Sequence, residues 1–292
     1  MINAKFIMPE FLQNNKINAT LLDIMNDYPE CIRDNTSVYG FYGNFPGCIW
    51  NCGRFLLGKI PSKKDIENVF SLYNNYYNLP LRLTFTNPAI DDEKYCWDSY
   101  ANLIAEIGNN GMNEILVVSP VLEKYLRKNY PNYKYCRSII GAKDKPYNLN
   151  NYYMSVLRQS YINDFNKIDQ IPQKDREFIE IICNDSCIDN CPRVYEHYME
   201  MGKSILQFNP NNPLANCTMN NKLNNEFFVW HDLALMNKFV SREKIDTEYL
   251  SRGFQHFKLC GRENSTRQMI NWLDYIFKPE YRNDIISIYL KN

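Results

Sequence analysis

Closely spaced cysteines follow an apolar run in the second half of the chain. Residues 178–183 (FIEIIC) are mostly apolar and β-branched, and the run NDSCIDNCP follows at residues 184–192. Cys187 and Cys191 are separated by three residues, so a compact turn would bring both sulfurs to one soft metal centre. Cys183 still belongs to the predicted strand, where its thiol can face the core as a small hydrophobic group.

Basic and amide side chains near other predicted strand ends form a second candidate set. Arg82 alternates with Leu81 and Leu83, so it would point into a barrel interior, where a buried guanidinium needs a ligand or a structural carboxylate. His231 could act as a base held by Asp232, although adjacent residues on a strand point oppositely. The predicted substrate-binding residues are Arg54, Arg82, Asn87, His197 and Arg262.

The elements that must position these residues alternate between strand-like and helix-like segments. The predicted strands are residues 37–43, 81–86, 114–119, 133–140, 152–158, 178–183, 232–240 and 254–260. The predicted helices begin at a Ser62 cap and then cover residues 92–107, 120–129, 163–171, 192–208, 242–251 and 266–277.

Eight alternating units are the number that closes a barrel. The sequence therefore predicts an α/β fold: a TIM-type (β/α)₈ barrel, irregular or incompletely closed at its weakest strands. We expect one domain over residues 1–292, with an Asn-rich loop insertion at residues 209–231. A doubly wound open sheet is the alternative, but no GxGxxG turn follows the first predicted strand.

A barrel of this kind brings several thiols to one end. Barrel enzymes carry their sites on the loops after the carboxyl ends of the strands. Four thiolates meeting there suit tetrahedral zinc or an iron–sulfur cluster, and spacing does not separate the two. The predicted ligands are Cys48, Cys187, Cys191 and Cys217, and Cys183 or Cys260 could replace one of them. We expect Cys31, Cys96 and Cys136 to be structural.

Composition limits the classes of binding partner and the cellular compartments that we expect. Lys plus Arg equals Asp plus Glu at 33 each, so no whole-chain positive field favours nucleic acid or an anionic membrane. The first residues lack the apolar region of a signal peptide, and no stretch approaches the roughly 20 apolar residues of a membrane span. We therefore expect a cytoplasmic protein whose ten cysteines are reduced.

Three segments resemble the peptidase U-thirty-two family. They are YGFYGNFPGCIWNCGR (residues 39–54), ICNDSCIDNCPRVYEHY (182–198) and FKLCGRE (257–263). The resemblance implies a barrel with a cysteine-bound iron–sulfur cluster, as in members that take part in oxygen-independent hydroxylation of ubiquinone precursors or RNA bases. Other members are described as collagenases.

The leading hypothesis combines these features. A [4Fe–4S] cluster would serve a redox or hydroxylation step on a small-molecule or modified-base substrate, with arginines binding its anionic group. A partner protein could also take part, and the sequence does not name the electron donor. A metal- or cysteine-dependent peptidase is one alternative, although no His-Glu-x-x-His or nucleophile elbow is present. A ligand-binding barrel without a cluster is the other.

Overall fold

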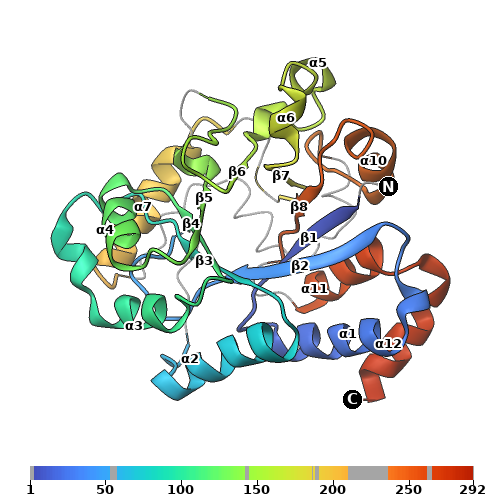
Figure 1. Ribbon diagram of the computed structural model, residues 1–292, viewed down its shortest axis with the longest axis horizontal. Coiled ribbons are helices and arrows are strands. Elements are labelled where there is room, and N and C mark those ends of the chain that lie inside the picture. Colours follow the sequence, from blue (N-terminus) through green and yellow to red (C-terminus); the bar gives the residue numbers. More distant parts are fainter. Residues whose placement is uncertain are drawn as a thin grey trace.

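The chain folds into a closed barrel of eight parallel strands. The computed structural model describes residues 3–52, 58–141, 145–185, 187, 191–209, 236–261 and 265–291. The strands pair in chain order and close between the last and the first (Figure 1). They are β1 (Ala4–Pro9), β2 (Thr36–Gly43), β3 (Leu81–Phe85), β4 (Glu114–Val117), β5 (Lys134–Arg137), β6 (Met154–Val156), β7 (Ile179–Ile182) and β8 (His256–Lys258). The predicted TIM-type (β/α)₈ fold is confirmed, and the barrel closes.

One predicted strand is wrong and one real strand was missed. The described part of the predicted strand at residues 232–240, residues 236–240, is not extended into a strand, although Val240 donates one backbone hydrogen bond to the Cys183 carbonyl at 2.8 Å. The strand that completes the barrel is β1, which pairs with β2 and β8. Its short sequence AKFIMP is buried on both faces, so it has no apolar and polar alternation to mark it.

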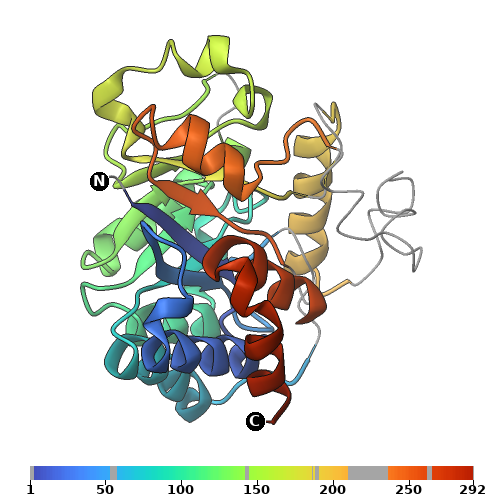
Figure 2. The ribbon, with the colours of Figure 1, turned by 90° about the vertical axis from the view of Figure 1, so that its right-hand side faces the viewer.

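Helices surround the barrel (Figures 1 and 2). They are α1 (Asn15–Asp27), α2 (Lys63–Phe70), α3 (Ser99–Ile107), α4 (Pro120–Asn129), α5 (Phe165–Ile168), α6 (Gln173–Arg176), α7 (Val194–Leu206), α10 (Arg242–Lys244), α11 (Ser265–Asn271) and α12 (Arg282–Lys291). Three of them, α2, α10 and α11, continue as π-helical turns, at Ser71–Tyr76, Ile245–Tyr249 and Trp272–Ile276.

Side-chain caps set several of these boundaries. Ser62 caps α2 in a capping box with Asp65, as the sequence predicts. The predicted helix at residues 92–107 is divided instead: a 3₁₀ turn (Glu93–Trp97) precedes α3, because the Asp98 side chain accepts a hydrogen bond from the Ala101 N–H and starts a new helix. None of the described helices has the length and apolar character that a membrane span requires.

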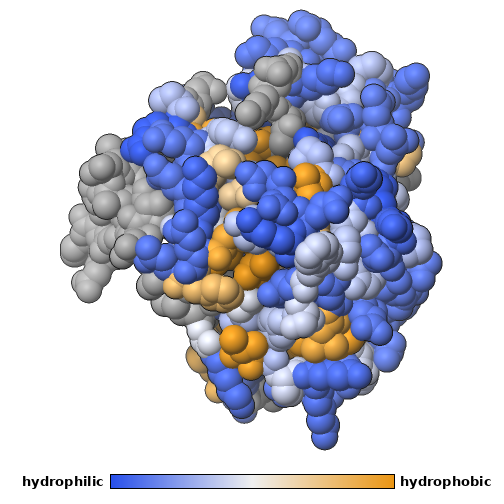
Figure 3. All heavy atoms as spheres, turned by 90° about the vertical axis from the view of Figure 1, so that its left-hand side faces the viewer, coloured by the Kyte–Doolittle hydropathy of each residue, from blue (hydrophilic) through white to orange (hydrophobic). Residues whose placement is uncertain are grey.

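One outer face of the molecule is mainly hydrophilic. On the face seen in Figure 3, hydrophilic residues predominate and the hydrophobic ones form separate small groups. The predicted insertion at residues 209–231 lies almost wholly outside the described residues.

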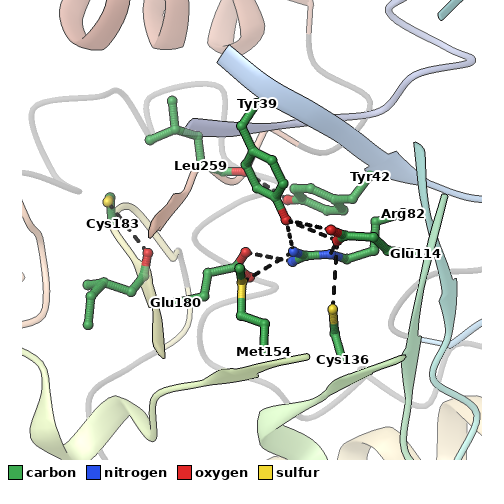
Figure 4. Close-up of polar contacts among 10 residues, drawn as sticks. Tyr39, Tyr42, Arg82, Glu114, Cys136, Met154, Glu180, Cys183 and Leu259 are labelled. Atoms are coloured by element: carbon green, nitrogen blue, oxygen red, sulfur yellow. Dashed lines mark hydrogen bonds and ion pairs between the residues drawn. The ribbon is translucent and has the colours of Figure 1, made fainter. Parts of the chain in front are cut away.

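Charged residues fill one layer of the barrel interior. Arg82 lies at the centre of this group, with its Nε 2.7 Å from Glu114 and its Nη1 2.5 Å from Glu180 (Figure 4). Its Nη2 also donates to the Tyr39 hydroxyl, which donates in turn to the Glu114 carboxylate at 2.9 Å. Arg82 and the two glutamates are at most 2% exposed. We call Tyr39, Arg82, Glu114 and Glu180 the interior network.

Candidate functional site

A cavity of about 700 Å³ lies at the carboxyl end of the barrel. Its floor is formed by inward-pointing strand residues, which are Tyr42, Thr84, Leu116, Val156, Ile182 and Lys258. Thr84 on β3, Ile182 on β7 and Lys258 on β8 belong to this floor. Each comes two positions after an inward-pointing residue of the same strand, which is Arg82, Glu180 or His256. Because residues two apart on a strand point to the same side, the interior network lies one layer below the cavity. The walls come from the loops that follow the strands, which is where a barrel enzyme carries its site.

Four thiol-bearing residues line this cavity. Cys52 follows β2, Cys187 and Cys191 follow β7, and Cys260 follows β8. The predicted ligands Cys187 and Cys191 are thus placed together at one cavity. The Cys52 thiol contacts the Tyr198 carbonyl of α7 at 3.2 Å, which ties the loop after β2 to the helix behind the cysteine segment.

The predicted ligand Cys48 and the alternative ligand Cys183 do not line this cavity. Cys48 is buried outside the cavity lining, and burial raises the pKa of its thiol to about 12. Cys183 is fully buried, with its sulfur 3.7 Å from the Ile181 carbonyl (Figure 4), and burial raises its pKa. Cys217 lies outside the described residues. The structure therefore favours Cys52 over Cys48 as the thiol supplied by the loop after β2.

The start of the cysteine segment is held by Asp185. Its carboxylate accepts the Cys187 N–H at 3.2 Å and lies 3.4 Å from the Lys238 ammonium. The Gln159 amide also donates to it. In the part of the chain that the structure describes, no three His, Cys, Asp or Glu side chains form a group that could hold a metal ion. The described thiols thus face one space without being gathered around one point.

The predicted substrate-binding residues have separate places. His197 lies on α7, lines the cavity and stacks on the Tyr198 ring. Arg82 points into the barrel as predicted, but the interior network supplies its anionic partners, so its surroundings are those of a structural ion pair. Arg54, Arg262 and the candidate base His231 lie outside the described residues.

The Asn87 side chain is hydrogen-bonded to backbone groups. Its Nδ2 donates to the carbonyls of Ile49 and Gly202, and its Oδ1 accepts the Ala89 N–H at 3.0 Å. The side chain is fully buried and does not line the cavity. These contacts indicate that Asn87 holds α7, and with it the cavity wall, against the loops after β2 and β3.

We expect Gly202→Ala to destabilise the protein by about 1–3 kcal/mol, the range for forcing an extra methyl into a packed site. A Cβ at Gly202 would lie 2.2 Å from Asn87 Oδ1, which its hydrogen bonds hold in place. Urea unfolding measures the effect, and Lys203→Ala, one position along α7 and exposed, is the matched control. Stabilisation by Gly202→Ala, the usual result in a free helix, would show that Asn87 does not hold α7.

The cavity residues that were not predicted as site residues include Glu10 and Lys258. Glu10 follows the missed strand β1; it is buried, lines the cavity and has a left-handed φ of 58°. A non-glycine residue in that region is strained, and such strain is concentrated at functional sites. Lys258 is part of FKLCGRE, and the only signal that could have found it is strand alternation, because it lies two residues after His256 on β8.

The Lys258 amine lies at the cavity floor. It is 7% exposed, and its Nζ lies 3.8 Å from the centre of the Tyr42 ring. Burial, the largest influence, lowers the pKa of Lys258, and the Glu180 carboxylate opposes that change. A buried lysine with a lowered pKa in a cleft is a candidate functional group.

Comparison with known proteins adds no family to this description. Neither the protein-family models nor the curated protein sequences contain a match to this chain. The resemblance to the peptidase U-thirty-two family therefore stays a prediction from the three segments quoted above, and the site must be interpreted from its own residues.

Proposed function

We propose that the cavity binds a thiolate-held iron–sulfur cluster and that the protein performs an oxygen-independent redox or hydroxylation step. The observation that carries the proposal is that Cys52, Cys187 and Cys191, from the loops after β2 and β7, line one cavity. Cysteine thiolates are the ligands of such clusters. We propose Cys217, which the sequence places in the insertion before residue 236, as the fourth ligand.

The described residues match this group in donor type. The thiols of Cys52, Cys187 and Cys191 line a cavity at the carboxyl end of the barrel, where catalytic groups of this fold are carried. The cysteines of the described residues are free rather than paired in disulfides. Cysteines are kept reduced in the cytoplasm, where they are free to bind a cluster as thiolates, and we propose that the protein acts there.

The size of the cavity suits a small-molecule or modified-base substrate. A cavity of about 700 Å³ is within the range of small-molecule sites. His197 and the hydroxyl and amide groups of the lining could orient the substrate, and Arg54 and Arg262 remain proposed partners of an anionic group. Arg82 is not included, since its guanidinium is bound by Glu114 and Glu180.

Cys52→Ala should remove the cluster, whereas Cys48→Ala should keep it. The two cysteines lie four residues apart in one loop, but only Cys52 lines the cavity, so Cys48→Ala is a matched control. After anaerobic purification, iron, sulfide and zinc are measured together with visible absorption. We expect Cys187→Ala and Cys191→Ala to behave like Cys52→Ala, because a lost thiolate leaves an iron without its ligand.

Other metal contents contradict the proposal. Zinc without sulfide would move the site toward hydrolysis or a structural role. A metal-free, colourless protein from anaerobic cells would leave a ligand-binding barrel. A full cluster in both Cys187→Ala and Cys191→Ala would place the ligands elsewhere.

A further inference from the structure

The Lys258 amine is a buried group without a polar partner among the described residues. Its Nζ makes no hydrogen bond or ion pair with any residue that the structure describes, and its one side-chain contact of note is with the face of the Tyr42 ring. The side chain is more than nine-tenths buried, yet it lines the cavity. A buried amine left without an acceptor is costly unless a ligand uses it.

The surroundings of Lys258 oppose a permanent charge on its nitrogen. The charged groups with the largest influence on its protonation are Glu180 and Arg82, which already pair with each other at 2.5 Å. Burial and the Arg82 charge favour the neutral amine, while Glu180 and the Tyr42 ring favour the ammonium. Burial is the largest of these influences, and a desolvated lysine near another cation is the usual setting of an amine nucleophile.

We propose that Lys258 captures a small carbonyl compound as a Schiff base. The amine lone pair forms a C–N bond to the carbonyl carbon while the C=O π electrons move to oxygen, which gives a carbinolamine. Loss of the oxygen as water, with both amine protons, leaves a C=N bond between Lys258 and the substrate. The step consumes no oxidant or reductant, and it is independent of any cluster in the cavity.

The cavity holds a group that can move a proton in this step. Glu10 brings a carboxyl group to the lining, and the dehydration of a carbinolamine needs an acid to protonate the departing oxygen. A lysine at the floor of the cavity, with a carboxyl group in its wall, thus suits a carbonyl compound.

Borohydride trapping tests this inference directly. The protein as purified is incubated with pyruvate, a keto acid, or with glycolaldehyde, an aldehyde, and is then treated with sodium borohydride and examined by peptide mass spectrometry. We expect several times more reduced adduct on Lys258 than on Lys63, because the cavity brings the carbonyl compound to a buried amine that has no polar partner among the described residues. Lys63 is a suitable reference because its side chain is 66% exposed.

Variants separate capture at Lys258 from general lysine chemistry. Lys258→Met and Lys258→Arg should both lose the preferential adduct, and Lys63→Met should keep it. Trapping on the wild-type chain remains informative if a Lys258 variant fails to fold. The inference is overturned if neither probe labels Lys258, or if Lys258 is labelled no more than Lys63. Cluster content is scored separately, so failure of one proposal leaves the other standing.

Discussion

Arg82→Met should lower the free energy of unfolding by about 3–5 kcal/mol, the usual cost of removing one partner from a buried ion pair. Arg82 bridges Glu114 and Glu180, and all three side chains are at most 2% exposed. Without the guanidinium, two carboxylates stay in the barrel interior with no cation between them. Urea unfolding at neutral pH measures the loss, with circular dichroism to confirm that the variant folds.

Two further variants show whether the loss comes from uncompensated charge. Arg127→Met removes an arginine from an ion pair with Glu123 that is partly open to solvent, and it should cost no more than about 1 kcal/mol. Adding Glu180→Gln to Arg82→Met should recover part of the lost stability, because one buried negative charge is removed with it. If Arg82→Met costs less than Arg127→Met, the interior network does not hold the barrel together.

The barrel was predictable because most of its strands have local signals. In β3, Arg82 and Thr84 alternate with Leu81, Leu83 and Phe85, which indicated both the strand and the inward direction of Arg82. The missing element was β1, whose residues are buried on both faces and so show no period of two. The prediction counted residues 232–240 as a strand in place of β1, so it reached eight strands with one of them wrong.

The location of the site was predictable from the sequence, but the set of residues that form it was not. Cys187 and Cys191 follow a strand, and closure of the barrel brings that loop to the cavity. Whether Cys48 or Cys52 faces the same cavity depends on how the loop after β2 folds, which the spacing of the two residues does not show. Glu10 could not be found without β1.

Lys258 was overlooked for a different reason. The groups around Lys258 come from β2 and β7, which are far from it in the sequence. Its burial and its contact with Tyr42 therefore exist only once the barrel has closed. Alternation along β8 indicates which way it points, but a lysine in a short strand is usually a solvent-facing residue. Tertiary packing, rather than local pattern, makes this amine unusual.

Stability should fall as the pH is lowered from about 6.5 to about 4, and His256 should account for up to about 3 kcal/mol of that fall. The imidazole is 7% exposed, and burial lowers its pKa from 6.5 to about 4, against the opposing influence of Glu180. The unfolded chain takes up a proton near pH 6.5, whereas the folded protein resists it until about pH 4. The contribution is therefore complete above pH 6.5 and is lost as the pH falls toward 4.

His256→Gln tests this assignment because it removes the titrating ring and keeps a polar side chain at the position. The His256 Nδ1 is buried without a hydrogen-bond partner among the described residues, so a proton added there would have no acceptor. Urea unfolding at several pH values should give a shallower acid decline for the variant than for the wild type. Parallel declines, or an NMR titration of the His256 imidazole with a midpoint near its unperturbed value, would show that buried carboxylates rather than His256 set the acid limit of this barrel.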